Sequence, residues 1–389
     1  MTEKPVEILT PFKDITEFIE ESGSDAFKDC FQCGRCETYC PWNRTGRRFD
    51  VRRIIHESQL GIVAVESEDM WLCVTCRNCV EHCPRGVDTI ELMTALRRVL
   101  IPDGKVPPGL PTVSAVMAGV ATVGNPWKAE PEDRAKWAKD LSVKDFTEGT
   151  GVLYFPCCTT AFDPRIQPIG RATAEILAAA GVDFGILGTK ENCCGESVRK
   201  LGNEVQFKRL ARENIKTFID NGVKKIVVSS PHCYHSFENE YPEFMVDFDV
   251  VHSTQYLYEL IRDEKISFTK EYPKKVAYHD PCYLGRHNGI YDEPREVLKS
   301  VPGLELVEML DNRAESLCCG AGGGRMWMET AKEERFSDMR IQQAIDAGAD
   351  VLAVACPYCM VMYKDSVKSV HKEDVLEIRD ITEIVREAM

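Results

Sequence analysis

The segment Cys30-Phe-Gln-Cys33-Gly-Arg-Cys36-Glu-Thr-Tyr-Cys40-Pro41 has the pattern C-x2-C-x2-C-x3-C-P, and the segment from Cys73 to Pro84 repeats it. In this pattern three closely spaced cysteines surround one face of an iron-sulfur cube, and the fourth reaches the other cube. C-x2-C pairs also bind structural zinc, but a duplicated run of four cysteines ending in proline favours two clusters. The predicted ligand sets are crossed: Cys30, Cys33, Cys36 and Cys83 for one cubane [4Fe-4S] cluster, and Cys73, Cys76, Cys79 and Cys40 for the other.

Helical patterns accompany the two cysteine runs. Apolar residues recur at helical spacing over residues 49–60 and 87–100, which predicts a helix at each place. We therefore expect a helical ferredoxin-type domain over residues 1–105. Prolines and glycines accumulate over residues 106–150, as in a linker between independently packed units. An uncharged stretch in this linker predicts a helix over residues 112–124 that is buried or faces a partner and is too short to span a bilayer.

The rest of the chain is an internal repeat. Three cysteine groups recur in the same order, and the spacings between groups differ by one residue between the copies. The groups of the first copy are Cys157-Cys158, Cys193-Cys194 and Ser230-Pro231-His232-Cys233. Those of the second copy are Cys282, Cys318-Cys319 and Cys356-Pro357-Tyr358-Cys359. We call residues 151–268 unit one and residues 269–389 unit two.

Each unit alternates short apolar runs with longer helical patterns. The order predicted for unit one is strand 152–155, helix 169–180, strand 182–187, helix 197–221 and strand 225–229. The order predicted for unit two is strand 276–279, helix 294–301, strand 304–309, helix 328–347 and strand 351–355. This alternation predicts two α/β units with largely parallel sheets. Every cysteine group follows a strand, so the groups of one unit should meet at the carboxyl edge of its sheet.

Unit two should therefore gather five thiols in one pocket. They belong to Cys282, Cys318, Cys319, Cys356 and Cys359. Two adjacent cysteines do not both suit one tetrahedral ion, whereas a multi-iron cluster offers several irons to neighbouring thiolates. The pattern thus predicts a site with more than one metal. The alternative is a set of buried free thiols that behave as small apolar side chains.

Unit one differs at one position, because Ser230 stands where unit two has Cys356. The aligned cysteines that remain are Cys158, Cys193, Cys194 and Cys233. A serine oxygen is a poorer iron ligand than a thiolate. The alternatives here are a cluster with altered ligation, a smaller cluster, zinc or no metal, with His232 and His235 either as substitute ligands or as surface residues. Cys157 aligns with a proline of unit two, so we expect it to be dispensable.

The composition indicates a compartment and disfavours some partners. The chain has 389 residues, 18 cysteines, and a formal net charge of -14 from 48 basic and 62 acidic residues. So many thiols, with no apolar signal core at the N-terminus, indicate a reducing cytoplasmic compartment. The acidic balance disfavours nucleic acid or an anionic membrane surface as the main partner. No direct membrane span is expected, so membrane association would come through another subunit.

The double cysteine run followed by two CCG-type units resembles the heterodisulfide reductase D-type proteins, in which a ferredoxin-like part and a CCG-domain part are fused. The resemblance covers nearly the whole chain from Cys30. Its most specific motifs are His279-Asp280-Pro281-Cys282-Tyr283 and the segment from Cys318 to Met328. It implies a non-cubane [4Fe-4S] cluster on the five cysteines of unit two, as the catalytic group. Unit one matches only in part because of Ser230, so the resemblance implies one special cluster supplied by two ordinary ones.

The expected function is that of an iron-sulfur electron-transfer subunit of an anaerobic oxidoreductase complex. Another redox subunit, containing flavin or iron-sulfur clusters, would exchange electrons with the two cubanes and the unit-two cluster. A catalytic reductase of a small disulfide is the second hypothesis, and a non-enzymatic metal-binding module is the third. The sequence has no flavin or nicotinamide motif, so two-electron chemistry would lie with other subunits.

Three further roles are expected beside the unit-two cysteines. The run Gly322-Gly323-Gly324 would let the backbone approach the cluster closely and donate N–H groups, unless it is a plain turn. Arg325 would offset the negative charge of the cluster. His279 would either give a proton to a departing thiolate or donate a hydrogen bond to a ligand.

Overall fold

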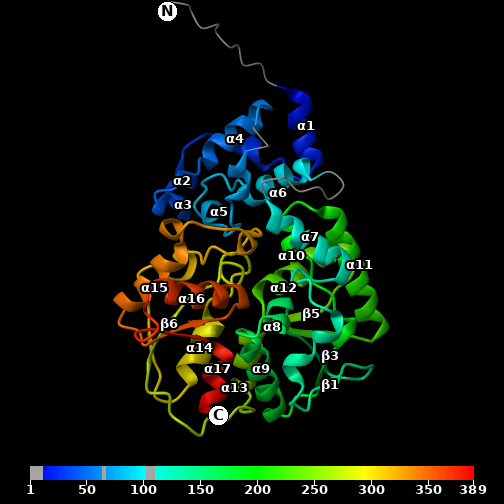
Figure 1. The fold of residues 1–389 in the computed structure, drawn as a ribbon, viewed down its shortest axis with the longest axis vertical. Helices are drawn as coiled ribbons and strands as arrows, with labels where there is room; N and C mark the ends of the chain where they lie inside the picture. The colour runs from blue at the N-terminus through cyan, green and yellow to red at the C-terminus, as the bar shows by residue number, and fades with distance from the viewer. Residues whose placement is uncertain (1–11, 64–66, 102–109) are drawn as a thin grey trace, which may run out of the picture.

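The computed structural model describes residues 12–63, 67–101 and 110–389. It consists of a helical part, at the top of Figure 1, and two α/β parts that lie side by side beneath it. Unit one is green and unit two runs from yellow to red. Most of the N-terminal segment, and the boundary expected near residue 105, lie outside the described residues. Mixed α/β architecture with a helical N-terminal part is confirmed.

The helical part carries both cysteine runs. Its longer helices are α1 (Lys13–Glu21), α4 (Val51–Leu60) and α6 (Thr89–Leu100). Its short helices follow the cysteine loops: α2 (Arg35–Tyr39), α3 (Pro41–Arg44) and α5 (Asn78–Glu81). The two predicted helices are present as α4 and α6. Helix α6 begins at Thr89 because the Asp88 carboxylate accepts hydrogen bonds from the backbone N–H groups of Ile90 and Glu91, at 2.9 and 3.1 Å.

The expected linker includes the first strand of unit one. Helix α7 (Pro111–Val123) is present as predicted and ends at Gly124, whose φ of +68° terminates it. Strand β1 (Lys144–Asp145) pairs with β3 (Phe184–Ile186), so the end of residues 106–150 belongs to the unit-one sheet. No helix within the described residues is long and apolar enough to cross a membrane.

Each unit is built on a parallel sheet, as predicted. The strands of unit one, besides β1 and β3, are β2 (Val152–Phe155), β4 (Lys225–Val228) and β5 (Asp249–His252), in the order β1-β3-β2-β4-β5. The strands of unit two are β6 (Lys275–Tyr278), β7 (Glu305–Val307), β8 (Val351–Val354) and β9 (Glu377–Asp380), in the order β7-β6-β8-β9. The chain reverses its direction across the sheet between β2 and β4, and again between β6 and β8. Such switch points are where α/β sheets hold ligands.

Two of the predicted long helices are shorter in the structure. Residues 197–221 form α10 (Glu196–Lys200) and α11 (Glu204–Asp220), interrupted at Gly202. Gly202 has φ of +92°, and a Cβ there would lie 2.7 Å from the carbonyl oxygen of Arg97. In unit two, helix α15 (Phe336–Asp346) covers only the second half of residues 328–347, because the first half passes through a short 3-10 turn, Lys332–Glu334.

The two units pack together through equivalent helices. Helix α17 (Ile381–Ala388) packs on α9 (Gln167–Ala179), and α13 (Ser253–Arg262) packs on α14 (Asp292–Ser300). In each pair the last helix of one unit meets the first long helix of the other, and these helices lie between the two sheets in Figure 1. This reciprocal arrangement follows from the repeat.

Candidate functional site

The five thiols of unit two lie together at the carboxyl edge of its sheet. Cys282 follows β6, and Cys318 and Cys319 lie in the loop after β7. Cys356 is the N-cap of α16 (Pro357–Ser369), whose first turn carries Cys359. All five are buried, and their thiols form a hydrogen-bonded series in the order Cys282, Cys318, Cys319, Cys359, Cys356. The structure thus brings the five predicted ligands together, and their binding of a cluster stays a prediction.

Hydrogen bonding separates these thiols into donors and acceptors. Burial raises the pKa of Cys359, and the neighbouring Cys319 and Cys356 raise it further. Burial also tends to raise the pKa of Cys356, but hydrogen bonds from Cys359 and His232 lower it to about 6. Cys356 is therefore a thiolate at neutral pH, which is the form that binds metal.

His279 approaches the cysteines from the end of β6. Its Nε2 lies 3.4 Å from the Sγ of Cys359, and the Nε of Arg340 donates to its Nδ1 over 3.3 Å. Because Nδ1 accepts this bond, the imidazole proton lies on Nε2 and faces the sulfur. Burial holds the pKa of His279 well below its usual value, and Arg340 lowers it further, so the ring is neutral. Of the two roles expected for His279, this geometry favours hydrogen bonding to a ligand sulfur.

Arg286 is a site residue that sequence reasoning missed. Burial tends to lower its pKa, but the nearby thiolates of Cys76, Cys282 and Cys318 raise it above the usual value. Within the described residues no carboxylate pairs with this guanidinium, which donates instead to backbone carbonyls. It is a buried positive charge beside a set of thiolates, and its place four residues after Cys282 is the only signal in the sequence.

The structure also brings together the two crossed sets of ferredoxin-type cysteines. Burial raises the pKa of Cys30, and the thiolates of Cys83 and Cys33 contribute to the increase. Burial likewise raises the pKa of Cys40, followed by the thiolates of Cys76, Cys79 and Cys73. The fourth cysteine of each run therefore lies with the first three of the other run. Ligation by these eight cysteines stays a prediction.

The two cysteine loops share an unusual backbone conformation. Gln32 and Gly34 flank the second cysteine of the first run with φ of +65° and +82°, and Thr75 and Arg77 flank that of the second run with φ of +49° and +67°. Residues other than glycine adopt this region at a cost of about 1–3 kcal/mol, typically at functional sites. The conformation turns backbone N–H groups inward, and that of Gln32 donates to the Sγ of Cys30 over 3.4 Å.

These features suit iron-sulfur clusters. Thiolates are the usual ligands of such clusters, and N–H groups directed at the sulfurs tune them. Further amide donors reach the cysteine sulfurs from Val87 to Cys83 at 3.3 Å and from Gly320 to Cys318 at 3.3 Å. In the part of the chain that the structure describes, no three Cys, His, Asp or Glu side chains are arranged around a single metal ion.

The helical part and unit two meet directly at their cysteines. The thiol of Cys76 hydrogen-bonds that of Cys318. The glycine run makes this approach possible, because a Cβ on Gly322 would lie 2.3 Å from the carbonyl oxygen of Val74, and one on Gly323 would lie 2.4 Å from that of Cys73. The glycines thus serve the contact with the second cysteine run, and not the close approach to the unit-two thiols that the sequence suggested.

Two arginines behave differently from expectation at this junction. Arg325, expected to offset cluster charge, lies over the ring of Trp42 and donates to Glu329 and Thr330. Arg97, not singled out from the sequence, is fully buried and donates to four backbone carbonyls in all three parts of the molecule. The accepting residues, at 2.8–3.0 Å, are Met70, Cys73, Lys200 and Gly323.

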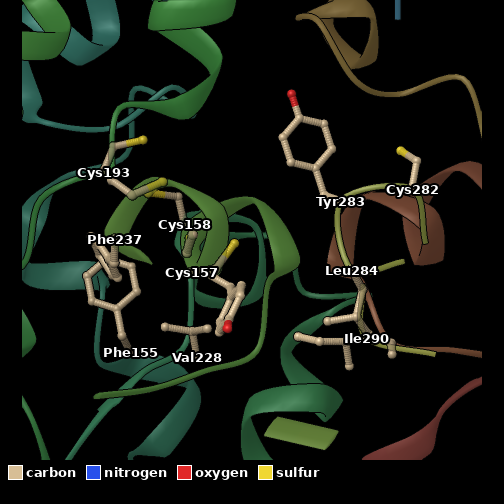
Figure 2. Close-up of a cluster of buried hydrophobic side chains, with 14 of the residues drawn as sticks. Phe155, Cys157, Cys158, Cys193, Val228, Phe237, Cys282, Tyr283, Leu284 and Ile290 are labelled. Atoms are coloured by element: carbon tan, nitrogen blue, oxygen red, sulfur yellow. The ribbon is translucent and has the colours of Figure 1, made fainter. Parts of the chain in front are cut away.

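Unit one also gathers its thiols at the carboxyl edge of its sheet. Figure 2 shows Cys157, Cys158 and Cys193 close to one another, apart from Cys282 and Tyr283 of unit two. Both Nη atoms of the buried Arg134 lie 3.6 Å from the Sγ of Cys158, and Nη1 lies 2.7 Å from the carboxylate of Glu191. Neither Arg134 nor Glu191 was anticipated from the sequence.

The two histidines considered as unit-one ligands point toward unit two. His232 stacks on Tyr283 with ring centroids 4.0 Å apart, pairs with Glu196 at 3.1 Å and hydrogen-bonds Cys356. His235 packs edge-on against Tyr283, at 5.3 Å between centroids. Burial tends to lower the pKa of His232, but Glu196 and Cys356 raise it to about 10. His232 therefore links unit one to the unit-two site as a cation.

Comparison with known proteins agrees with this architecture. A model of a 4Fe-4S dicluster domain matches residues 24–87, and a model of the CCG cysteine-rich domain matches residues 152–238 and 276–364. A relative in Methanosarcina mazei, the D-type polypeptide of dihydromethanophenazine:CoB--CoM heterodisulfide reductase, is 32% identical over 92% of this chain and 93% of its own length. The chain belongs to the heterodisulfide reductase D-type family.

Other relatives of this family member are longer or more distant. A probable iron-sulfur-binding oxidoreductase of Bacillus subtilis, FadF, is 38% identical over 85% of this chain, which spans about half (48%) of the length of that protein. A crystal structure of a hypothetical protein from Helicobacter pylori covers 97% of the chain and is itself covered to 73%, with a TM-score of 0.55 and 12% identity. That likeness concerns the fold alone.

Proposed function

We propose that this member of the heterodisulfide reductase D-type family is an iron-sulfur electron-transfer subunit of an oxidoreductase complex. Electrons would pass between a cluster on Cys30, Cys33, Cys36 and Cys83, a cluster on Cys40, Cys73, Cys76 and Cys79, and a cluster on the five cysteines of unit two. Bound cubane clusters exchange single electrons at potentials set by burial, charge and hydrogen bonds to sulfur. A non-cubane form of the unit-two cluster is part of this proposal.

The contact between Cys76 and Cys318 carries the proposal. It joins a thiol of the second cysteine run to a thiol of unit two, so ligands of successive clusters would touch. Three side chains hold this contact without taking part in ligation. Arg286 and Arg97 bind the carbonyls of Cys76 and Cys73, and the hydroxyl of Tyr283 lies 3.0 Å from that of Thr75. The route is therefore rigid and closed to water.

The experiment compares the reduction of the two kinds of cluster in the full chain, prepared anaerobically. After mixing with a reductant, freeze-quench EPR should show the cubane signals before the unit-two signal. Gly323→Val, which forces the unit-two loop away from Cys73, should slow the second phase at least tenfold and leave the first unchanged. Gly348→Ala, where a Cβ meets nothing within 4 Å, is the matched control. Equal rates in Gly323→Val and the control would exclude this route.

The partner would be a second redox subunit that contains flavin or iron-sulfur clusters. Cys33 is the exposed thiol of the cubane-type sets, and the neighbouring side chain of Phe31 is 60% exposed. This end of the route is the accessible one, so the partner would dock there. A cytoplasmic location, at the membrane only through such a partner, belongs to the same proposal.

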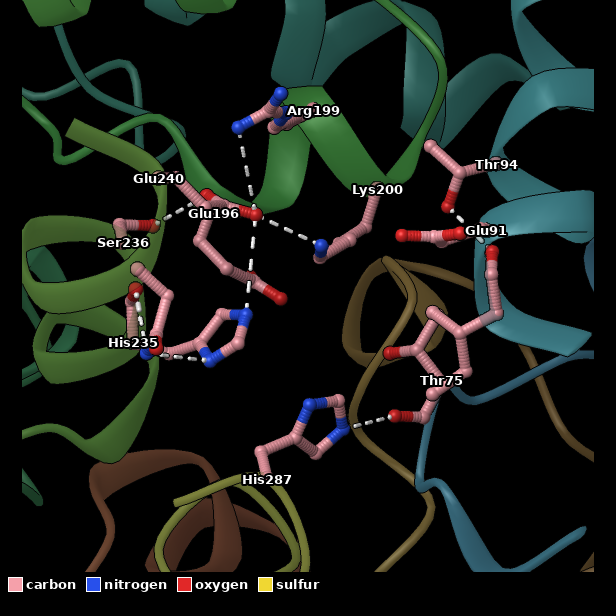
Figure 3. A network of polar contacts seen from close by, with 12 residues as sticks. Thr75, Glu91, Thr94, Glu196, Arg199, Lys200, His235, Ser236, Glu240 and His287 are labelled. Carbon is pink, nitrogen blue, oxygen red and sulfur yellow. Dashed lines mark hydrogen bonds and ion pairs between the residues drawn. The ribbon is translucent and has the colours of Figure 1, made fainter. Parts of the chain in front are cut away.

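A cavity favours a second candidate function, the reduction of a small disulfide. It has a volume of about 440 Å3 and lies where the helical part and both units meet. Figure 3 shows its polar lining, in which Lys200 pairs with Glu240 at 2.8 Å and His287 accepts or donates at the carbonyl of Thr75. The ring of His287 stacks on Tyr283, the residue after Cys282. A disulfide held in the cavity would lie close to the unit-two site.

Activity of the isolated chain distinguishes the two functions. With reduced viologen as donor and a small disulfide as acceptor, an electron-transfer subunit should show no turnover beyond that of the viologen alone. Turnover that falls at least tenfold in Lys200→Ala, but not in the exposed control Lys216→Ala, would favour the disulfide reductase.

A further inference from the structure

Cys157, expected to be dispensable, has a backbone conformation that requires a reason. It is buried and has φ of +78°, in the region that favours glycine. A residue other than glycine persists there at a cost of about 1–3 kcal/mol, and such strain collects at ligand sites. Cys157 lies between the end of β2 and α8 (Cys158–Phe162). The strain turns its side chain toward the other thiols of unit one.

The thiols of unit one form the same series as those of unit two. Hydrogen bonds connect them in the order Cys158, Cys193, Cys194, Cys233, Cys157. In unit two the order is Cys282, Cys318, Cys319, Cys359, Cys356. The first four members correspond by sequence. Cys157 therefore has the place that Cys356 has in unit two.

Strand register explains how a different residue reaches this place. Strands β2 and β4 are neighbours in which Phe155 pairs with Val228, so residues 157 and 230 stand two positions beyond one register pair. In unit two, Tyr278 of β6 has Ala353 of β8 as its partner, which sets Pro281 beside Cys356 in the same way. Each unit thus has one cysteine at this pair of positions, on β2 in unit one and on the other strand in unit two.

Ser230 does not replace the missing thiolate by its own bonding. It is completely buried, and its Oγ has no hydrogen-bond partner among the described residues. An unpartnered buried hydroxyl costs about 1–3 kcal/mol, so a ligand or bound group at this edge would relieve it. The Oγ thus marks a place where the described side chains leave a polar atom unsatisfied.

The surroundings of the unit-one thiols match those of unit two. The backbone N–H of Gly195 donates to Cys193 over 3.4 Å, as that of Gly320 donates to Cys318 over 3.3 Å. Arg134 places a buried positive charge beside Cys158, as Arg286 does beside Cys282. Free thiols need neither the charge nor the strained Cys157, whereas an anionic cluster uses both.

We propose that unit one holds its own iron-sulfur cluster and that Cys157 supplies the fifth thiolate, in place of the cysteine lost at Ser230. The ligands are Cys157, Cys158, Cys193, Cys194 and Cys233. This site lies outside the electron route proposed above, which ends in unit two. Its loading is therefore independent of the direction and the partner of electron transfer.

The test is the iron and acid-labile sulfide content of the full chain, reconstituted anaerobically and examined by EPR and Mössbauer spectroscopy. The wild-type chain should hold about sixteen irons, in four clusters of four. Cys157→Gly should hold about twelve, because glycine accepts the φ of +78° and only the thiol is lost. Ser230→Ala should retain about sixteen, since the hydroxyl is not a required ligand.

A relocated thiol makes the test specific. In Cys157→Gly/Ser230→Cys the fifth thiol returns from the neighbouring strand, as in unit two, and the content should recover to about sixteen irons. About twelve irons in the wild-type chain, or about sixteen in Cys157→Gly, would overturn the proposal. So would loss of four irons in Ser230→Ala. The slow reduction expected for Gly323→Val does not depend on these outcomes, so the two proposals can fail separately.

Discussion

The Nε of Arg286 donates a hydrogen bond of 2.7 Å to the backbone carbonyl oxygen of Cys76. One residue belongs to unit two and the other to the second cysteine run, so the bond crosses the junction between them. The Nη1 of the same guanidinium donates to the carbonyls of Ala314 and Ser316, at 2.9 and 2.7 Å. The side chain is therefore held rigidly, and its charge faces the thiolates on both sides of the junction.

Arg286→Gln should make the unit-two cluster harder to reduce. Reduction adds negative charge, and a nearby buried cation stabilises the reduced form. Loss of that cation is expected to cost about 1–3 kcal/mol, which lowers a one-electron potential by about 40–130 mV. An EPR-monitored redox titration measures the shift. Arg262→Gln, on an exposed side chain, is the control, and an equal potential in both variants would contradict a charge effect.

Arg97→Lys should loosen the three parts from one another. A lysine cannot reach the four carbonyls that Arg97 binds, so at least two would be left buried and unsatisfied. We expect the free energy of unfolding to fall by about 2–4 kcal/mol. The change appears as a lower urea midpoint, followed by tryptophan fluorescence under anaerobic conditions. Arg98→Lys, on a half-buried neighbour paired with Glu204, should lose less than about 1 kcal/mol.

The Asp380 carboxyl should make stability depend on pH near neutrality. It caps α17 between the units, and burial raises its pKa to about 7, although hydrogen bonds from Thr382 lower it. The folded chain thus holds a proton that the unfolded chain releases near pH 4. Its contribution is complete below that pH and is lost as the pH rises to about 7, by up to about 1.4 kcal/mol per pH unit.

Asp380→Asn tests this dependence because asparagine keeps the cap but does not titrate. Thermal unfolding midpoints measured from pH 5.5 to 8 should decline less steeply in the variant than in the wild-type chain. Parallel profiles would mean that Asp380 is ionised in the folded state throughout this range.

Crossed ligation predicts which cubane each fourth cysteine serves. Cys40→Ala should give the same spectroscopic loss as Cys76→Ala, although the two residues belong to different runs. Cys83→Ala should instead match Cys33→Ala. Each variant should lose about four irons, and EPR of the dithionite-reduced chain identifies the cluster that remains. Pairing of Cys40→Ala with Cys33→Ala would refute the crossed sets.

Local patterns predicted much of the fold. Central strands such as β2 and β8 consist of consecutive buried apolar residues, so their runs stood out. The edge strands β5 and β9 were missed, because they mix charged residues with apolar ones, as in Glu377-Ile378-Arg379-Asp380. One short 3-10 turn, Lys332–Glu334, has a helical composition, and tertiary contacts shorten the helix predicted there.

The cysteine sets were predictable for a similar reason. Ligands of a cubane come mostly from one loop, and those of a unit follow strands whose ends must meet. The charges around them were not predictable, since Arg97 lies 226 residues in sequence from the carbonyl of Gly323 that it binds. Arg286 lies 210 residues from Cys76. No periodicity or spacing relates such partners.

The sequence by itself determined the domain order, the parallel sheets and the gathering of thiols at sheet edges, because these follow from local hydrophobic periodicity and repeated spacing. Tertiary structure alone decided the contact of Cys76 with Cys318, the packing role of Gly322 and Gly323, and the position of Cys157 beside residue 230. Each depends on which strands and loops become neighbours. Burial then gives these contacts their effect, since charges and unpaired polar groups count most where water is excluded.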